Sequence, residues 1–189
     1  LDEMIRVFKA HNDILWSHYR RGEIKKELLS VKRFELTLNS FYVDNPGLAQ
    51  DIALEYVTMR PERSYLFPNA VEALSYLSEK YQLHIITNGF EEVQFQKLKI
   101  TGIERYFRNV ITSEEAGVKK PDPFIFELAM HKAGSSEYNS IMVGDDLEVD
   151  IEGAKNAGID QVLFNPDNIK HDYKVNYEIQ DLNQLKDIF

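Results

Sequence analysis

Cysteine is absent from the 189 residues of this chain, which excludes a disulfide framework and any site built on thiolate chemistry. No uninterrupted apolar run reaches the length of a membrane-spanning helix, and no signal-peptide pattern is found. Positive charge is also scarce, since 22 basic residues face 31 acidic ones for a net charge of −9. That balance argues against binding to a nucleic-acid backbone or to an anionic membrane. We therefore expect a soluble, cytoplasmic protein that binds neither.

Apolar residues are plentiful enough for a folded core, at 43% hydrophobic against 28% charged residues. In the first third of the chain they recur at helical spacing in three stretches. The third stretch begins at Asn45-Pro46, a capping residue followed by a proline suited to the first helical turn, and it ends at Pro61. We predict a helical bundle over residues 1–64 and a second unit over residues 65–189.

From Asn69 onward, short apolar strands alternate with single helices, which is the pattern of a parallel α/β sheet. The predicted strands and the helices between them cover residues 83–86, 91–100, 109–111, 123–133, 140–143, 147–157 and 161–164. Asn69 is expected to cap the helix that precedes the first strand. The predicted fold class is α/β, a doubly wound parallel sheet in which ligands bind beyond the carboxyl ends of the strands.

The third predicted strand ends in a dense group of acids, in the segment Gly144-Asp145-Asp146-Leu147-Glu148-Val149-Asp150. Gly144 allows the chain to turn tightly at the strand end. Aspartates this close repel one another and are costly to desolvate unless a cation lies among them, and Mg²⁺ favours oxygen ligands. The segment has two interpretations, a Mg²⁺ site or a solvated acidic loop whose charges complement the start of the next helix.

Two other strand ends carry groups suited to an anion. The first strand ends in Thr87-Asn88-Gly89, which offers a hydroxyl, an amide and main-chain N–H groups, or else simply caps the following helix. The second is followed by Gly117-Val118-Lys119-Lys120-Pro121-Asp122-Pro123. A lysine fixed there can hold a phosphate or balance buried acids, unless the segment is a turn with surface lysines. Threonine, lysine and acids on successive strand ends are more specific together than any one of them.

In this order the motifs resemble those of the haloacid dehalogenase-like (HAD) hydrolase superfamily. Ile85-Ile86-Thr87-Asn88-Gly89 is similar to the family's second motif, residues 117–123 to its third, and Gly144-Asp145-Asp146 with Asp150 to its fourth. The resemblance covers residues 61–165 and implies a Rossmannoid core. A match to three motifs in the same order is far more specific than a match to any one of them.

The resemblance implies roles for individual residues. Thr87 and Lys120 are the implied catalytic residues. The implied phosphate site consists of Thr87, Asn88, Gly89 and Lys120. Asp145 is the implied direct ligand of Mg²⁺, and Asp150 is a second ligand or the partner of one, while the role of Asp146 is left open.

The helical unit also fits the resemblance, because one branch of the family inserts a helical cap between its first and second motifs. Trp16, Tyr19, Gly22-Glu23-Ile24 and Arg33-Phe34 are similar to the cap of the YjjG-like 5′-nucleotidases. The same aromatic residues are equally typical of the core of a packed helical bundle. The whole chain is therefore expected to be a HAD-like α/β core with an inserted helical-bundle cap.

The family's first motif, an apolar strand that ends in Asp-x-Asp and supplies the nucleophile, is not found in these residues. A parallel sheet without its central strand leaves main-chain groups unpaired, at about 1–3 kcal/mol for each buried one. We therefore expect an upstream segment that supplies this strand and its aspartate, so that residues 65–189 form a core lacking its first strand.

The residues and the resemblance together predict a Mg²⁺-dependent phosphatase of small phosphorylated metabolites. More specifically, they predict a 5′-nucleotidase that acts on nucleoside monophosphates through an aspartyl-phosphate intermediate. A haloacid dehalogenase-type hydrolase is one alternative, which the three aspartates disfavour because removal of halide needs no metal. A non-catalytic relative that binds a phosphorylated ligand is the other, and it requires that the first motif be truly absent. The expected partner is a small-molecule phosphate ester, with no nucleic-acid polymer and no membrane.

Overall fold

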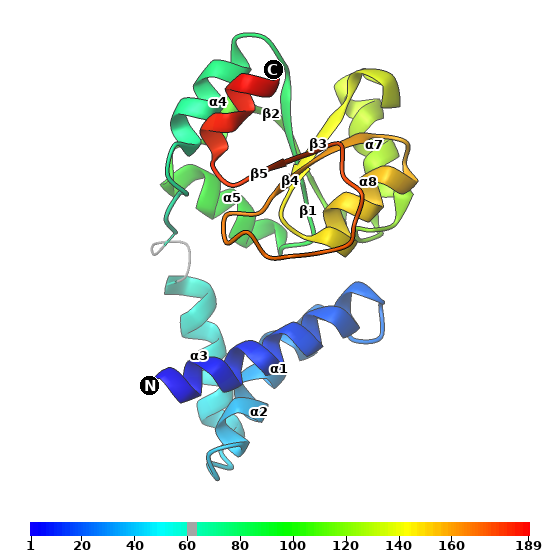
Figure 1. Ribbon diagram of the computed structural model, residues 1–189. Coiled ribbons are helices and arrows are strands. Elements are labelled where there is room, and N and C mark those ends of the chain that lie inside the picture. The colour runs from blue at the N-terminus through cyan, green and yellow to red at the C-terminus, as the bar shows by residue number, and fades with distance from the viewer. Residues whose placement is uncertain (60–63) are drawn as a thin grey trace. The chain divides into compact units, whose positions relative to one another are not determined.

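The structure is a computed structural model that describes residues 1–59 and 64–189, and the chain divides into two compact units, Leu1–Arg63 and Ser64–Phe189 (Figure 1). Each unit has hydrophobic clusters of its own. The predicted helix end at Pro61 lies outside the described residues. None of the described helices combines the length and the apolar character needed to cross a membrane.

The described part of the first unit is built from helices that pack through their apolar faces. They are α1 (Asp2–Arg20), α2 (Lys26–Asn39) and α3 (Pro46–Met59). The predicted start of α3 is confirmed, because Asn45 Oδ1 accepts a hydrogen bond from Leu48 N at 3.0 Å. Phe34 of α2 packs against Ala49 and Ala53 of α3, so the small side chains of α3 allow the two helices to approach closely.

A buried cation lies among the aromatic residues of this bundle. Arg33 is 2% exposed, and its guanidinium lies over the rings of Phe34 and Tyr56, at 5.1 and 4.8 Å from their centroids. Arg33 Nη1 also donates to Asn12 Oδ1 (3.1 Å), which ties α2 to α1. For Arg33 and Phe34 the contacts therefore favour the interpretation of a packed bundle.

The second unit is organised around parallel strands. Those in the described part are β1 (Leu83–Thr87), β2 (Phe107–Thr112), β3 (Ile141–Gly144), β4 (Asp160–Phe164) and β5 (Tyr177–Ile179). β1 pairs with β2, and a second sheet has the order β3-β4-β5, with every pairing parallel. The first four strands lie at the predicted positions. β5 was not predicted, because three residues are too few to show a strand period.

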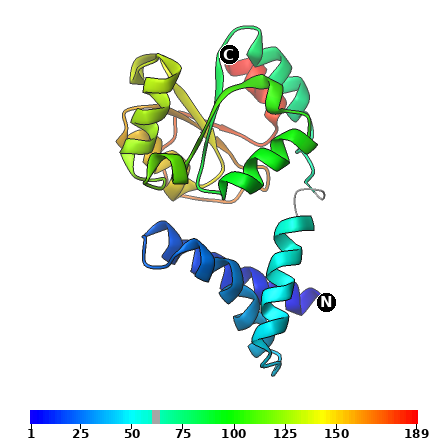
Figure 2. The same cartoon turned by 180° about the vertical axis from the view of Figure 1, so that it is seen from behind.

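Helices cover both faces of these strands, which confirms the doubly wound prediction. They are α4 (Ala70–Ser78), α5 (Glu91–Ile100), α6 (Ser113–Ala116), α7 (Pro123–Ala133), α8 (Gly153–Asn156) and α9 (Leu185–Ile188). Figures 1 and 2 show α4 and α9 on one side of the strands and α7 and α8 on the other. Two separate hydrophobic clusters result, one around Val162 and Ile179 and one around Ile111 and Phe126.

Strands β1 and β3 do not pair with each other in the described residues, so each keeps one edge without a strand partner. Every residue of β1 is only half-buried, and Ile141 and Val143 of β3 are 41% and 38% exposed. Apolar residues in the middle of a parallel sheet are ordinarily covered on both faces. The central strand expected from the sequence stays a prediction, and these two edges are where it would pair.

Two local predictions were wrong. Asn69 occupies the N-cap position of α4, but its side chain makes no capping hydrogen bond. Its Nδ2 donates to both carboxylate oxygens of Asp181 at 2.9 Å, and these charge-assisted bonds orient the amide toward a residue remote in sequence. The single helix predicted over residues 147–157 is a π-helical turn, Leu147–Glu152, followed by the short α8.

Candidate active site

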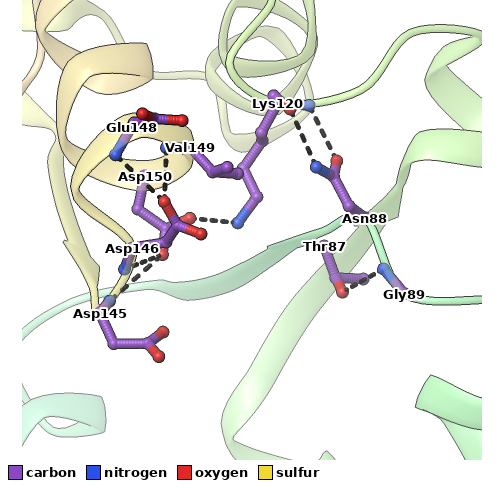
Figure 3. A network of polar contacts seen from close by, with 9 residues as sticks. All are labelled: Thr87, Asn88, Gly89, Lys120, Asp145, Asp146, Glu148, Val149 and Asp150. Carbon is purple, nitrogen blue, oxygen red and sulfur yellow. Dashed lines mark hydrogen bonds and ion pairs between the residues drawn. The ribbon is translucent and has the colours of Figure 1, made fainter. Parts of the chain in front are cut away.

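The carboxyl ends of β1 and β3 are joined by polar contacts that run through Lys120 (Figure 3). Lys120 lies in the segment between α6 and α7, and its peptide bond to Pro121 is cis. On one side its main chain contacts Asn88, which follows β1, and on the other its ammonium contacts Asp150, which follows β3. The structure therefore brings together residues from all three predicted motifs.

Lys120 and Asp150 form a buried ion pair. Their side chains are 9% and 7% exposed, and Nζ lies 2.5 Å from Oδ1. The second carboxylate oxygen, Oδ2, accepts hydrogen bonds from the main-chain N–H groups of Asp145 and Asp146, both at 3.2 Å. A buried charge pair is tolerated when further hydrogen bonds satisfy its remaining lone pairs, as happens here. The alternative of a surface lysine at this position is therefore wrong.

Asn88 pairs with the main chain of Lys120 through both of its polar side-chain atoms. Asn88 Nδ2 donates to the Lys120 carbonyl oxygen at 2.9 Å, and Asn88 Oδ1 accepts from Lys120 N at 2.8 Å. Thr87 and Gly89 contact each other instead, since Thr87 Oγ1 accepts a hydrogen bond from Gly89 N at 3.0 Å. Figure 3 shows Thr87, Asn88 and Gly89 on the β1 side of Lys120 and the aspartates on the other.

Asp145 is the aspartate most open to a ligand. Its side chain reaches solvent, and Figure 3 draws no hydrogen bond or ion pair from its carboxylate to the other labelled residues. Partial desolvation by nearby protein atoms raises the pKa of Asp145, and the charges of Asp150 and Asp146 raise it further, while a main-chain hydrogen bond and the charge of Lys120 oppose the rise. An ionised carboxylate in these surroundings gains from a cation.

The donor set fits Mg²⁺ but does not form a complete metal cage. Within the described ranges, no group of three His, Asp or Glu side chains is placed to hold a metal ion together. Mg²⁺ usually takes only one or two protein carboxylates and fills its other positions with water and phosphate oxygens. Asp145 can supply one such carboxylate, while Asp150 is already engaged by Lys120 and by main-chain N–H groups.

Asp146 has a structural role. Its Oδ1 accepts hydrogen bonds from Glu148 N (3.1 Å) and Val149 N (2.9 Å), which caps the π-helical turn that follows. The interpretation that the acids complement the start of the next helix is confirmed for Asp146. It is not confirmed for Asp150. Adjacent acids in one short segment thus serve different purposes, which their spacing alone did not reveal.

Gly144 is required for a reason other than a tight turn. Its backbone does not lie in the left-handed region, but a Cβ at this position would overlap the side chain of Asp150, including its Cβ and Oδ2. The glycine therefore allows Asp150 to approach the end of β3 closely enough to accept hydrogen bonds from the main chain beyond it. Sequence reasoning identified the residue and misassigned the cause.

Replacement of Gly144 by alanine is expected to displace Asp150 and with it the ammonium of Lys120. We expect a loss of about 1–3 kcal/mol in the free energy of unfolding, as for overpacking elsewhere, and a fall in turnover of roughly 100-fold. Urea unfolding and steady-state kinetics measure the two effects. Gly47→Ala in α3, where the new Cβ makes only ordinary contact, is the matched control. Wild-type turnover in Gly144→Ala would refute this reading of the site.

Comparison with known proteins gives matches over most of the chain. Residues 35–164 match a family model described as haloacid dehalogenase-like hydrolase. The chain is 35% identical over 158 residues to the pyrimidine 5′-nucleotidase YjjG of Escherichia coli, covering 83% of this chain and 68% of the relative. It is 30% identical over 180 residues to the pyrimidine 5′-nucleotidase PynA of Streptococcus pneumoniae, covering 93% and 75%.

A solved structure resembles the whole chain. It is that of the putative HAD-hydrolase YfnB from Bacillus subtilis bound to magnesium, with a TM-score of 0.90 and 26% identity. The match covers 100% of this chain and 83% of that one. Fold and sequence comparisons therefore point to the same group of proteins as the motifs at the strand ends.

Proposed function

The chain belongs to the haloacid dehalogenase-like hydrolase family, and we propose that, as a phosphohydrolase of that family, it acts on nucleoside monophosphates as a Mg²⁺-dependent 5′-nucleotidase. Two of the relatives above are pyrimidine 5′-nucleotidases, which supports this substrate class. The observation that carries the metal-dependent part is the position of Asp145, a solvent-reaching carboxylate at the end of β3 next to the buried carboxylate of Asp150. A dehalogenase has no need of such a residue, because it stabilises no phosphate dianion.

Asp145 is the proposed direct ligand of Mg²⁺, and Asp150 is the proposed support that holds Lys120 and the main chain around Asp145. Bound Mg²⁺ would supply electrostatic stabilisation of the charge on the phosphoryl oxygens. Asp150 is a candidate for a second ligand of the ion. To bind it, Asp150 would have to release one of its present hydrogen-bond partners. The family resemblance assigns the nucleophile to an aspartate of the first motif, which is not found among residues 1–189.

The residues of this chain are proposed to bind and orient the phosphoryl group. The oxygen of the Thr87 hydroxyl accepts a hydrogen bond from Gly89 N, which still leaves its O–H group able to donate one. We assign that donated bond to a phosphoryl oxygen. The Lys120 ammonium carries two N–H bonds beyond the one directed at Asp150, and these are assigned to the charge that develops during transfer. In the reaction that the family resemblance implies, an aspartate of the first motif bonds to phosphorus as the bond to the nucleoside 5′-oxygen breaks, that oxygen gains a proton, and water then hydrolyses the aspartyl phosphate.

The proposed function predicts a specific pattern of substrate use. The full-length protein is assayed for release of inorganic phosphate from pyrimidine and purine nucleoside 5′-monophosphates and from sugar phosphates, and for release of halide from 2-haloacids. We expect the pyrimidine nucleotides to give the highest kcat/KM, and chelation of Mg²⁺ to abolish the activity. Halide release that persists after chelation would refute the proposal, and so would phosphate release that does not depend on Mg²⁺.

A further inference from the structure

We propose that Asn88 is a positioning residue that fixes the main chain of Lys120, rather than a ligand of the substrate phosphate. This inference rests on the proposed function, since it concerns the residue assigned to the phosphoryl charge. Asn88 follows β1, and Lys120 lies 32 residues further along the chain. The inference replaces the role of a phosphate-binding amide that the sequence implied for Asn88.

The contact between Asn88 and Lys120 has a specific geometry. One amide side chain pairs with both polar groups of one main-chain residue, at 2.9 Å through its nitrogen and 2.8 Å through its oxygen. The orientation of the amide is therefore fixed, because a flipped amide would set N–H against N–H and oxygen against oxygen. Two bonds to one residue restrain both its position and its rotation, which a single bond does not.

The contact between Asn88 and Lys120 is part of a longer series of polar contacts. The Asn88–Lys120 contact is continued by the ion pair from Lys120 Nζ to Asp150, whose other oxygen accepts from the main chain of Asp145. In the described part of the chain, β1 and β3 share no ladder hydrogen bonds. This series of contacts therefore sets the ammonium of Lys120 relative to the strand ends that carry Thr87 and Asp145.

The side chain of Asn88 could still form further hydrogen bonds. Its side chain retains one N–H and one oxygen lone pair beyond the contacts with Lys120. A direct phosphate contact through that N–H is the competing hypothesis, and it makes a different prediction. Loss of a phosphate ligand weakens binding of the ground state, whereas loss of a positioning contact mainly lowers the rate of the chemical step.

The kinetic test compares Asn88→Ala with wild type on the best substrate, with Mg²⁺ present. If Asn88 positions Lys120, kcat falls roughly 10–100-fold, while KM and inhibition by inorganic phosphate change by less than about threefold. The effect should also vanish when Lys120→Met is already present, because the two residues act as one unit. Independent, multiplicative losses in the double variant would overturn the proposal, as would a loss confined to KM and phosphate inhibition.

A second measurement does not depend on catalysis. Brief acylation of the folded protein, read by peptide mass spectrometry, reports how accessible each lysine amine is. Lys120 is 7% exposed and should react slowly in wild type. In Asn88→Ala we expect its labelling to rise roughly tenfold through local opening, without a change at other lysines. Unchanged protection of Lys120 would show that the ion pair with Asp150 is enough to hold Lys120 in place without Asn88, and the proposal would fail.

Asn109→Ala is the matched control for both measurements. Asn109 lies on β2 and also bonds a remote main-chain carbonyl, that of Lys132, at 3.3 Å, as well as His84 Nδ1. The Asn109→Ala substitution should leave kcat and the labelling of Lys120 at wild-type values. If the protein hydrolyses none of the phosphate esters, the proposed function fails, and the labelling experiment still decides whether Asn88 holds Lys120.

Discussion

Replacement of Asp145 by asparagine is expected to abolish Mg²⁺-dependent turnover, with a loss of roughly 10³-fold or more in kcat. The amide keeps the size of the side chain and removes the negative charge that a cation requires. Kinetics at saturating substrate measure the loss, and a Mg²⁺ titration followed by calorimetry tests whether affinity for the ion falls with it. Turnover near the wild-type value would contradict the assignment of Asp145 as the metal ligand.

The same substitution should not destabilise the metal-free protein at neutral pH. The pKa of Asp145 is raised in the folded state, so folding favours its protonated form. Above that pKa the ionised carboxylate lowers the stability of the folded protein. Thermal unfolding of Asp145→Asn without Mg²⁺ should occur at or slightly above the wild-type temperature at pH 7. The difference should shrink as the pH falls toward the ordinary aspartate value of 3.8. A clear loss of stability at pH 7 would mean that the main-chain hydrogen bond stabilises the carboxylate more than burial and the neighbouring aspartates destabilise it.

Asp146→Asn is the matched control, since it changes the neighbouring carboxylate in the same way. Asp146 caps the π-helical turn, and asparagine caps a helix about as well as aspartate. We expect turnover within a small factor of wild type and little change in stability. A loss as large as that of Asp145→Asn would show that both carboxylates serve the metal.

Replacement of Lys120 by methionine is expected to produce the largest combined effect on stability and activity. Removal of one partner leaves the charge of Asp150 buried and under-compensated, which typically costs about 3–5 kcal/mol. The two main-chain N–H groups that remain on Asp150 place the expected value near the lower end. Loss of the ammonium should also reduce kcat roughly 10²–10³-fold, because it removes the charge that the proposed mechanism assigns to the phosphoryl oxygens.

Two further variants separate these causes. Lys120→Met with Asp150→Asn removes both charges, and stability should recover in part while turnover stays low. Lys155→Met breaks an ion pair with Glu152 whose side chains are 52% and 41% exposed, and should cost at most about 1 kcal/mol. Urea unfolding of these proteins gives the comparison. Equal losses for Lys120→Met and Lys155→Met would show that burial of the first pair contributes nothing.

Much of the fold could be predicted from local patterns. The direction of side chains repeats over a few residues in a helix or a strand, so the spacing of apolar residues indicates which of the two forms. Four strands and α7 were located from this spacing. Caps made by neighbouring residues were also predictable, as at Asn45. Asn69 shows the limit of such reasoning, because its partner Asp181 lies 112 residues away and no local pattern indicates it.

Local sequence patterns were enough to predict the α/β fold class, the positions of the strand ends and the polar residues that follow them. The contacts of those residues became known from the folded chain: Lys120 is buried against Asp150, Asn88 binds the main chain of Lys120, and Asp146 is a cap. The physical reason is that secondary structure depends on neighbours along the chain, whereas a buried charge is stable only with partners that distant segments supply. Motif spacing indicates which residues meet at the site, and the path of the chain decides which of their atoms bond.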